Sequence, residues 1–369
     1  HARVIDAFTG KSLSRINDRD VGNWFSEFDP NGKFVVLSGY AGPDDYRSGL
    51  LIWNWENRKI DRFIPVDDQI GVFAASISKN GDLIATFEGD TSVAVYDSRS
   101  GAVKTRIRPT SHDINSVRFS PDAKFLISAN RDSTAPIYNV ATGREIKKLF
   151  GHTSFVMDAV FSPDGKQIVT GSIDRSVRLW DVASGTLLWV SEVSENIIYR
   201  VFFSPDGKTI LVFDDGKKAI HLDAVSGQII DAADLSNNGR DVSFKRNLIV
   251  TEKNSFLTFY DLQDHSELVS LVFIDSTEWC VVHPSGLFDA SPGAMEKMYY
   301  VQGLDLIEFG QLKEKYWEPG LFEKVMNGEQ LRSVASIDKE LKLWPEVTDL
   351  TFSQNYEKLT VSLKNQGGG

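Results

Sequence analysis

Apolar and polar residues alternate along most of the chain in short runs that are separated by turn sequences. One pair of such runs covers residues 156–161 and 167–172, with a Ser-Pro-Asp-Gly sequence at residues 162–165 between them. Alternation with a period of two places successive side chains on opposite faces of a strand, and Pro and Gly in this order favour a tight turn. The pattern therefore predicts a hairpin, followed by a third strand over residues 177–180 and a fourth over residues 186–191.

This four-stranded unit recurs along the chain. The Trp-Asp pair that ends its third strand has counterparts at seven places in all, and consecutive pairs lie 42 residues apart between Asp97 and Asp223. The seven pairs are Ile5-Asp6, Trp53-Asn54, Tyr96-Asp97, Tyr138-Asn139, Trp180-Asp181, Leu222-Asp223 and Tyr260-Asp261. The hairpin turn recurs in step, as DPNG at Asp29, SKNG at Ser78, SPDA at Ser120, and SPDG at Ser162 and Ser204. Repeats of this length indicate stacked supersecondary units that bury a continuous core.

The segment from Gly151 to Gly185, GHTSFVMDAVFSPDGKQIVTGSIDRSVRLWDVASG, resembles a complete WD repeat. It combines a Gly-His opening, the Ser-Pro-Asp-Gly turn and a closing Trp-Asp at the spacing of that family. In that family each repeat forms one four-stranded antiparallel blade of a β-propeller. The resemblance therefore implies an all-β propeller made of such blades.

The WD resemblance also implies a buried hydrogen-bond network that holds the blade together. Its members here are Trp180, Ser172, His152 and Asp174. Thr170 takes the place of Ser172 if the register differs by two residues. The preceding repeat keeps His112 and Asp132, with Tyr138 at the Trp position. Buried polar atoms must be satisfied, so a closed network of this kind fixes the blade geometry. The alternative, an acid-base pair of His152 and Asp174, has no accompanying nucleophile.

The first repeat is incomplete, because residues 2–6 already have the character of a third strand. Near the other end, EWCVVHPSGLFDAS at residues 278–291 has an HPSG turn where other repeats have SPDG, which indicates a first and a second strand. An exposed strand edge needs a partner, and closing the ring removes such edges. We therefore expect a seven-bladed propeller over residues 1–291, with its last blade assembled from residues 278–291 and 2–17.

Beyond residue 291 the pattern changes to helical spacing over residues 306–326, and two further alternating runs follow within residues 347–363. Two strands do not make a domain by themselves. The pattern predicts a small C-terminal α/β extension. It consists of a helical connector over residues 292–344 and the truncated start of a β-sandwich-like domain over residues 345–369.

A second resemblance concerns the same part of the chain. The sequences EWCVVHPSGLFDASPG, YWEPGLFEKVMNGE and LKNQGGG within residues 277–369 resemble the connector of bacterial proteins in which a WD-repeat propeller precedes a caspase-like peptidase domain. That resemblance implies a protease domain with a His-Cys dyad farther along the same polypeptide. No position in this sequence matches the dyad, so the chain is then the non-catalytic part of a larger protease.

The composition, with 41% hydrophobic and 25% charged residues, is that of a soluble globular protein. The net charge of -11 argues against a nucleic-acid partner and against binding to an anionic membrane. Cys280 is the single cysteine, which excludes an intrachain disulfide and a cysteine-based metal site and suits a reducing compartment. No apolar run reaches the roughly 18 residues of a membrane-spanning helix. We expect a cytoplasmic protein that does not bind a membrane.

The sequence lacks recognisable catalytic and metal-binding motifs. It contains no HExxH, P-loop or nucleophile-elbow sequence, and neither His221 nor His265 has a metal-binding spacing to another histidine. The sequence thus predicts no catalytic residue, no metal and no cofactor. The alternative is a propeller enzyme, a hydrolase or lyase, with a small-molecule site in the central channel built from several blades. Carboxylates and histidines with perturbed pKa values in the channel would favour that alternative.

One repeat position suggests a partner-binding face. It lies eight residues before the last residue of each hairpin turn and carries Trp24, Phe73, Asn115, Met157 and Tyr199. In WD-repeat proteins this position commonly lies on the partner-binding face, and large apolar side chains are typical of binding hot spots. Arg131 and Arg175 flank the turn Asp positions and could bind a carboxylate. We therefore predict a non-catalytic scaffold that binds a protein or peptide. Alternatively these side chains fill the channel or pack under the next blade, and the inserted loop at residues 40–48 binds the partner.

Overall fold

The computed structural model describes residues 2–5, 12–16, 26–40, 48–66, 72–88, 92–109, 113–235, 239–253, 256–274, 278–302, 305–334, 346–352 and 359–364. The chain divides into two compact units. The first comprises residues 1–6 and 11–246, and the second comprises residues 7–10 and 247–369.

The first unit contains five four-stranded antiparallel sheets, each built from consecutive strands, which we call blades one to five. Blade one comprises β3 (Ser26–Phe28), β4 (Phe34–Tyr40), β5 (Ser48–Asn54) and β6 (Lys59–Pro65). Blade two comprises β7 (Val72–Ile77), β8 (Leu83–Glu88), β9 (Val93–Asp97) and β10 (Val103–Ile107). Blade three comprises β11 (Ile114–Phe119), β12 (Phe125–Asn130), β13 (Ala135–Asn139) and β14 (Glu145–Leu149). Blade four comprises β15 (Val156–Phe161), β16 (Gln167–Ser172), β17 (Ser176–Asp181) and β18 (Leu187–Glu192). Blade five comprises β19 (Ile198–Phe203), β20 (Thr209–Asp214), β21 (Lys218–Asp223) and β22 (Ile229–Asp234).

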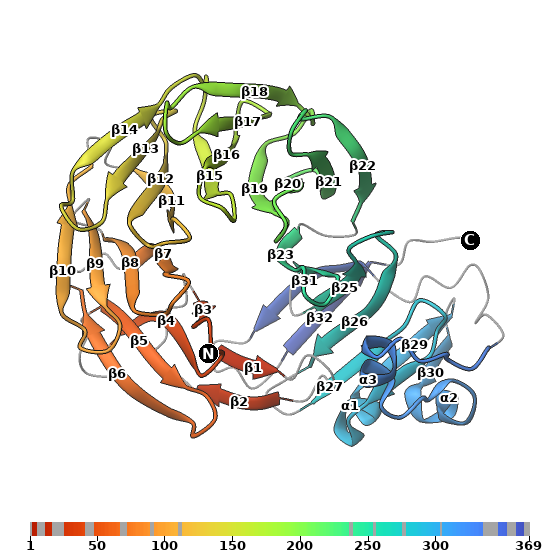
Figure 1. Ribbon diagram of the computed structural model, residues 1–369. Coiled ribbons are helices and arrows are strands. Elements are labelled where there is room, and N and C mark those ends of the chain that lie inside the picture. The colour runs from red at the N-terminus through yellow and green to blue at the C-terminus, as the bar shows by residue number, and fades with distance from the viewer. Residues whose placement is uncertain are drawn as a thin grey trace. The chain divides into compact units, whose positions relative to one another are not determined.

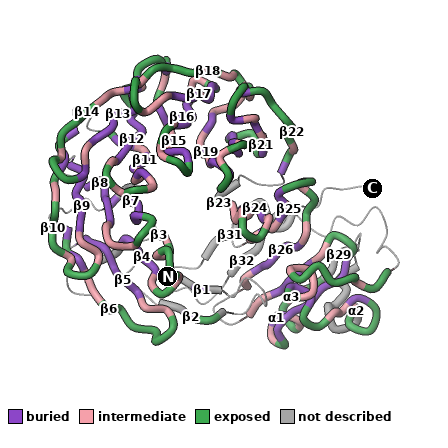
Figure 2. The backbone as a smooth tube through the Cα atoms, viewed as in Figure 1, coloured by how far each residue is buried: buried purple, intermediate pink, exposed green. Residues whose placement is uncertain are grey.

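In each of these blades the first strand lies innermost and the fourth lies outermost (Figure 1). Buried residues follow the middle strands, whereas exposed residues are frequent along the outermost strands (Figure 2). The apolar core lies between neighbouring blades. Ile127 and Ile137 of blade three, for example, share one buried cluster with Ile168 and Trp180 of blade four. Complete burial of one such side chain contributes about 1.5–3 kcal/mol, so the packing between blades stabilises the unit.

The hairpin turn between first and second strands explains why the repeats keep Ser, Asp and Gly. In blade four the Ser162 hydroxyl donates to Asp164 at 2.6 Å and accepts the backbone N–H of Gln167 at 2.9 Å. Asp164 also accepts the backbone N–H of Lys166 at 3.0 Å. Gly165 has a φ of 72°, a left-handed conformation that glycine adopts without the steric cost of a Cβ atom. The predicted hairpin therefore follows from interactions within the turn itself.

The propeller has six blades, so the expectation of seven is wrong. The sixth sheet has the strand order β23 (Gly239–Ser243), β24 (Leu248–Lys253), β25 (Phe256–Asp261), β26 (Glu267–Phe273), β27 (Trp279–Val282) and β28 (Phe288–Ala290). β27 pairs with β26, and β28 pairs with β27. β1 (Ala2–Ile5) pairs instead with β2 (Ser12–Ile16) in a two-stranded sheet. Pairing of strands that are close in sequence closes a shorter loop and costs less chain entropy than pairing of two distant segments.

Short helices follow the strands of the second unit. The remaining elements are α1 (Pro292–Lys297), β29 (Tyr299–Gln302), β30 (Asp305–Glu308), α2 (Phe309–Tyr316), α3 (Leu321–Met326), β31 (Glu346–Phe352) and β32 (Leu359–Lys364). Asp289 of β28 anchors this region. Its carboxylate accepts the indole N–H of Trp317 at 3.0 Å and the backbone N–H of Gly320 at 2.8 Å.

The helical spacing in the sequence corresponds mainly to α2 and α3. Leu306, which fits the helical spacing, lies in β30 instead. None of the helices in the described part of the chain is long and apolar enough to cross a membrane. The expected domain boundaries at residues 291 and 344 stay predictions.

Candidate functional site

A buried hydrogen-bond network joins Trp180 to Asp174 in blade four. The indole N–H of Trp180 donates to Oγ1 of Thr170 at 3.0 Å, and Nε2 of His152 lies 2.7 Å from the same oxygen. Nδ1 of His152 lies 2.8 Å from Oδ2 of Asp174. With the imidazole proton on Nδ1, the Thr170 hydroxyl donates to Nε2 and accepts from Trp180. The network is then fully satisfied with a neutral imidazole ring.

Of the two hydroxyl residues that the sequence left open, Thr170 and not Ser172 bonds Trp180 and His152. Both residues lie on the same face of β16 because they are two positions apart. Trp180 lies opposite Ile168, so Thr170 is the nearer of the two hydroxyls. The Ser172 hydroxyl instead donates to the carbonyl of Phe155 at 2.8 Å and accepts the backbone N–H of Asp174 at 3.1 Å.

The carboxylate of Asp174 is held in its ionised form by several donors. Its Oδ1 accepts the hydroxyl of Ser176 at 2.7 Å, and its Oδ2 accepts the backbone N–H of Thr153 at 2.9 Å. Burial by itself raises the pKa of Asp174, but the hydrogen bonds from His152, Ser176 and Thr153 outweigh burial and lower the pKa well below its usual range. Through these hydrogen bonds Asp174 links the turn after β16 to the segment before β15.

The network has the order of groups found in a hydrolytic triad, with a carboxylate, an imidazole and a hydroxyl in succession. Thr170, however, has no exposed surface, and its oxygen already bonds Trp180 and His152. A substrate cannot reach a hydroxyl in this position. The geometry therefore fits a role in holding the blade together.

Blade two contains a different buried network, which the sequence analysis missed. Glu88 is 1% exposed and occupies the position of Ser172 in the register of second and third strands. It accepts the hydroxyl of Tyr96 and, at 3.1 Å, that of Thr86. Its other oxygen lies 2.7 Å from Nη1 of Arg106. The sequence feature that could have indicated this network is the glutamate at the end of the apolar run LIATFE.

In blade three, the structure describes only part of the counterpart of the blade-four network. His112 lies outside the described residues. Asp132 accepts the Thr134 hydroxyl at 2.6 Å and the Thr134 backbone N–H at 3.1 Å. Tyr138 is buried at the Trp position, and burial raises the pKa of its hydroxyl.

The predicted partner-binding face is described at three of its five strand positions. Trp24 lies outside the described residues, and so does the side chain of Phe73. Asn115 donates through Nδ2 to the carbonyl of Val156 at 2.8 Å, and its Oδ1 accepts Nε of Arg131 at 3.2 Å. Asn115 therefore links the start of β11 to the start of β15.

The neighbouring positions leave apolar surface open at this end of the blades. Met157 and Tyr199 are half-buried at the starts of β15 and β19. Arg131 and Arg175 are exposed in the turns between second and third strands. Phe155, directly before β15, is 42% exposed, and the sequence analysis missed it although it is an aromatic residue after the polar Thr153-Ser154. We call these residues, together with Asn115, the strand-start surface. Of the inserted loop at residues 40–48, residues 41–47 lie outside the described part of the chain.

Charged side chains lie on the innermost strands. Nε of Arg118 on β11 lies 3.9 Å from Oδ1 of Asp158 on β15, which is 1% exposed. Burial raises the pKa of Glu27 on β3, while the charge of Arg118 opposes that shift. Among the described residues of β3, β7, β11, β15, β19 and β23 there is no histidine or cysteine. The combination of carboxylates with histidines that is expected for a channel enzyme is therefore not found on the described residues of these strands.

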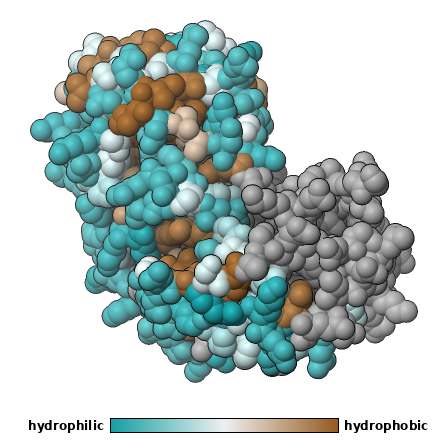
Figure 3. Space-filling model, turned by 90° about the vertical axis from the view of Figure 1, so that its right-hand side faces the viewer, coloured by the Kyte–Doolittle hydropathy of each residue, from teal (hydrophilic) through white to brown (hydrophobic). Residues whose placement is uncertain are grey.

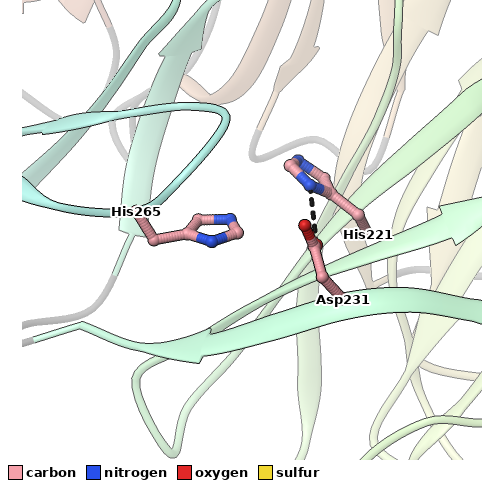
Figure 4. A group of neighbouring side chains, drawn as sticks. All are labelled: His221, Asp231 and His265. Carbon is pink, nitrogen blue, oxygen red and sulfur yellow. Dashed lines mark ion pairs between the residues drawn. The ribbon is translucent and has the colours of Figure 1, made fainter.

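His221 and Asp231 form a cross-strand pair in blade five. They lie opposite each other on β21 and β22, with Nδ1 of His221 2.9 Å from Oδ1 of Asp231 (Figure 4). Cross-strand pairs of this kind contribute about 0.2–1 kcal/mol to a sheet. His265, which is also labelled in Figure 4, belongs to the second unit, where it follows β25 with a φ of 58°.

Exposed apolar side chains also gather on the outermost strands of blades four and five. Leu187, Leu188, Val190, Ile229 and Ile230 are between 41% and 56% exposed. Figure 3 shows apolar residues concentrated at the top of the molecule, the level at which Figure 1 places β18 and β22. This outer apolar surface is made of different residues from the strand-start surface.

The comparison with protein families matches the WD domain, G-beta repeat, at residues 103–139 and 143–181. The chain is 34% identical to Protein tipD of Dictyostelium discoideum over 81 residues, which cover 22% of this chain and 13% of that protein. It is 30% identical to Nuclear distribution protein PAC1 of Arthroderma otae over 136 residues, which cover 33% of this chain and 28% of that protein. It is 24% identical to WD repeat-containing protein SL1-17 of Schistosoma mansoni over 99 residues, covering 27% of this chain and 33% of that protein.

These matches confirm the WD repeats that the sequence predicts. The chain carries WD40 repeats within a β-propeller. The matched segments span at most 33% of the length of the three relatives named. All three are proteins of eukaryotes, and their names mention no peptidase.

Proposed function

We propose that this chain is a non-catalytic, protein-binding scaffold and that the strand-start surface docks its protein or peptide partner. The observation that carries the proposal is the 42% exposure of Phe155 beside the half-buried Met157 and Tyr199. Apolar and aromatic side chains that remain open to water at one end of adjacent strands have the character of interface anchors. The WD repeats, which supply a rigid series of blades, support the same function.

The charge of this surface favours a partner segment that carries a carboxylate. Arg131 and Arg175 are exposed at the same end of blades three and four. A guanidinium group binds a carboxylate through two parallel hydrogen bonds, which fixes orientation as well as affinity. The preferred partner therefore presents an apolar side chain near an aspartate, a glutamate or a chain terminus.

The connector resemblance suggests a more specific role for this scaffold. We propose that the propeller recognises targets or regulators for a caspase-like protease domain of the same polypeptide in the cytoplasm. The sequences within residues 277–369 that resemble such a connector support this role. Sequencing the gene beyond the codon for Gly369 tests it. A downstream His-Cys dyad supports the role, whereas a stop codon or an unrelated domain contradicts it.

Photo-crosslinking tests the binding surface directly. A benzoylphenylalanine group in place of Phe155 should crosslink a defined partner in an extract of the source organism. The matched control carries the same group in place of Leu188, which is 47% exposed on β18. The same product from both positions, or a product from the control alone, contradicts the proposed surface.

Affinity measurements on the captured partner complete the test. Met157→Ser combined with Tyr199→Ser should weaken binding at least tenfold, because loss of a hot-spot side chain costs about 2 kcal/mol or more. Val190→Ser on the outermost strand should leave the affinity unchanged. Equal affinities for the two variants would show that the partner binds elsewhere.

A further inference from the structure

A cavity of about 390 Å³ lies between blades one and two, at the end of the strands that carries the hairpin turns. Its floor is apolar and includes Val36, Ile52, Ile77 and Ile84. Its rim carries six charged residues of both signs, which are Asp29, Lys33, Asp61, Arg62, Asp82 and Arg99. Pockets for small ligands commonly have about 300–1,000 Å³ and combine apolar walls with a few polar groups. We call this space the inter-blade cavity.

The inter-blade cavity exists where blade two departs from the other repeats. The residue that follows the Asp or Asn at the end of the third strand is Val140, Val182 or Ala224 in blades three, four and five. Each packs in the apolar cluster between its blade and the preceding one. In blade two the same position is Ser98, whose hydroxyl donates to the carbonyl of Gly81 at 2.6 Å. Ser98 is smaller than the valine of blades three and four, and unlike the alanine of blade five it turns a polar group toward the hairpin turn.

The rim of the cavity contains Lys33, whose counterparts in blades three to five are each paired with an aspartate. In blades three to five the lysine after the hairpin turn pairs with the aspartate of that turn. The pairs are Lys124 with Asp122 at 3.3 Å, Lys166 with Asp164 at 3.7 Å and Lys208 with Asp206 at 3.9 Å. Blade one has Asn31 at the aspartate position. Lys33 consequently has no acidic partner among the described residues.

The outermost strand of blade one contributes an acid and a second cation. Asp61 is exposed on β6, and no hydrogen bond or ion pair joins it to the residues that the structure describes. Arg62 uses Nη1 to bind the carbonyl of Ser98 at 3.0 Å. Asp82, by contrast, is paired with Arg99 at 3.2 Å. The rim thus presents Lys33 and Asp61, two side chains of opposite charge without a charged partner among the described residues, above an apolar floor.

We infer that the inter-blade cavity binds an aliphatic zwitterion, a free aliphatic amino acid or a dipeptide. Lys33 and Arg62 would hold the carboxylate, Asp61 the ammonium group, and the isoleucine and valine floor the aliphatic side chain. A simple carboxylic acid leaves Asp61 without a partner, and a simple amine leaves Lys33 without one, whereas a zwitterion neutralises both. The site lies at the opposite end of the strands from the strand-start surface, so it does not depend on the proposed scaffold function.

Calorimetric titration of the whole chain with matched probes tests this inference. L-Leucine and L-leucyl-L-leucine carry both charges, leucinamide lacks the carboxylate, and N-acetyl-L-leucine lacks the ammonium group. We expect at least one of the first two to bind, and each of the last two to bind at least tenfold more weakly. The tighter of the two zwitterions identifies the amino acid or the dipeptide as the ligand class. Absence of binding by both zwitterions at millimolar concentration, or equal binding of all four probes, overturns the inference.

Variants of the rim residues and of Ser98 complete the test. Ser98→Val introduces the side chain that blades three and four carry, and it should abolish binding by filling the cavity. Lys33→Gln and Asp61→Asn change exposed side chains, so the protein should fold normally and bind at least tenfold more weakly. Lys208→Gln, at the same turn position of blade five, is the matched control and should bind as the parent chain does. Unchanged affinity in Lys33→Gln and Asp61→Asn refutes the assigned contacts even if Ser98→Val fails to fold.

Discussion

Nη1 of Arg106 lies 2.7 Å from Oε2 of Glu88, and Glu88 is buried within blade two. The same guanidinium nitrogen lies 3.0 Å from the hydroxyl of Ser92. An ionised carboxylate in a protein interior costs several kcal/mol unless a paired charge and hydrogen bonds compensate it. The sequence of blade two contains no histidine to match His152, and this ion pair joins β8 to β10.

Replacing Arg106 with methionine should therefore destabilise the protein strongly. The change leaves Glu88 buried without its charged partner, and such losses cost about 3–5 kcal/mol. The free energy of unfolding in urea measures the effect. Arg99→Met removes an arginine whose partner, Asp82, has a side chain that is 45% exposed, and should cost about 0–1 kcal/mol. A similarly small loss of unfolding free energy in both variants would show that the buried pair contributes little to stability.

Thr170→Val should destabilise blade four. The change removes the hydroxyl that both the Trp180 indole and the His152 ring use, and each stranded polar group costs about 1–3 kcal/mol. Thermal and urea unfolding give the loss directly. Thr186→Val, an exposed threonine in the same blade, should change the stability by less than about 0.5 kcal/mol. Equal midpoints for the two variants would mean that the network contributes little.

Asp174 should make the folded protein sensitive to acid. Its pKa is lower in the folded chain than in the unfolded chain, because hydrogen bonds to the carboxylate outweigh the effect of burial. A group of this kind stabilises the fold fully above its unfolded pKa of about 4, and the contribution declines as the pH falls below that value. The unfolding free energy should therefore fall more steeply below about pH 4 in the parent chain than in Asp174→Asn. Parallel pH profiles would contradict this assignment.

Cys280 should be unreactive in the folded protein. It has no exposed surface in β27, and burial raises the pKa of its thiol well above the usual value. Thiolate is the form that reacts with disulfide reagents, so both access and ionisation are suppressed. Titration with an aromatic disulfide should detect no thiol in native buffer and one thiol per chain in denaturant. Rapid reaction in native buffer would place Cys280 nearer the surface than the structure does.

The blades were predictable because their determinants are local. The turn at Ser162 and the alternation on both sides of it lie within one hairpin, and its strands follow the expected bounds. The number of blades was not predictable in the same way. It depends on whether a segment near the other end of the chain pairs with β28, whose partner strand here is β27. That choice depends on pairing between segments that are distant in the sequence, which no local pattern encodes.

The candidate site was predictable in type but not in every residue. Thr170 and Ser172 are both hydroxyl residues on one face of β16, and the position of Trp180 opposite Ile168 decides which of them joins the network. Glu88 has the sequence character of a surface charge, and its burial makes sense once Arg106 is seen beside it. Such pairings depend on the register between strands, and the sequence of a single strand does not contain it.

The pairing of β27 along β26 has a consequence for the behaviour of the chain in solution. Leu268 and Ser270 of β26 are half-buried and buried, whereas Leu188 and Val190 at the corresponding positions of blade four are 47% and 50% exposed. An uncovered apolar edge is a template for strands of other molecules. A chain that ends before β27 would present such an edge, and we expect light scattering to detect its aggregation under conditions in which the whole chain stays monodisperse. We therefore expect β27 and β28 to protect the protein against self-association through this edge.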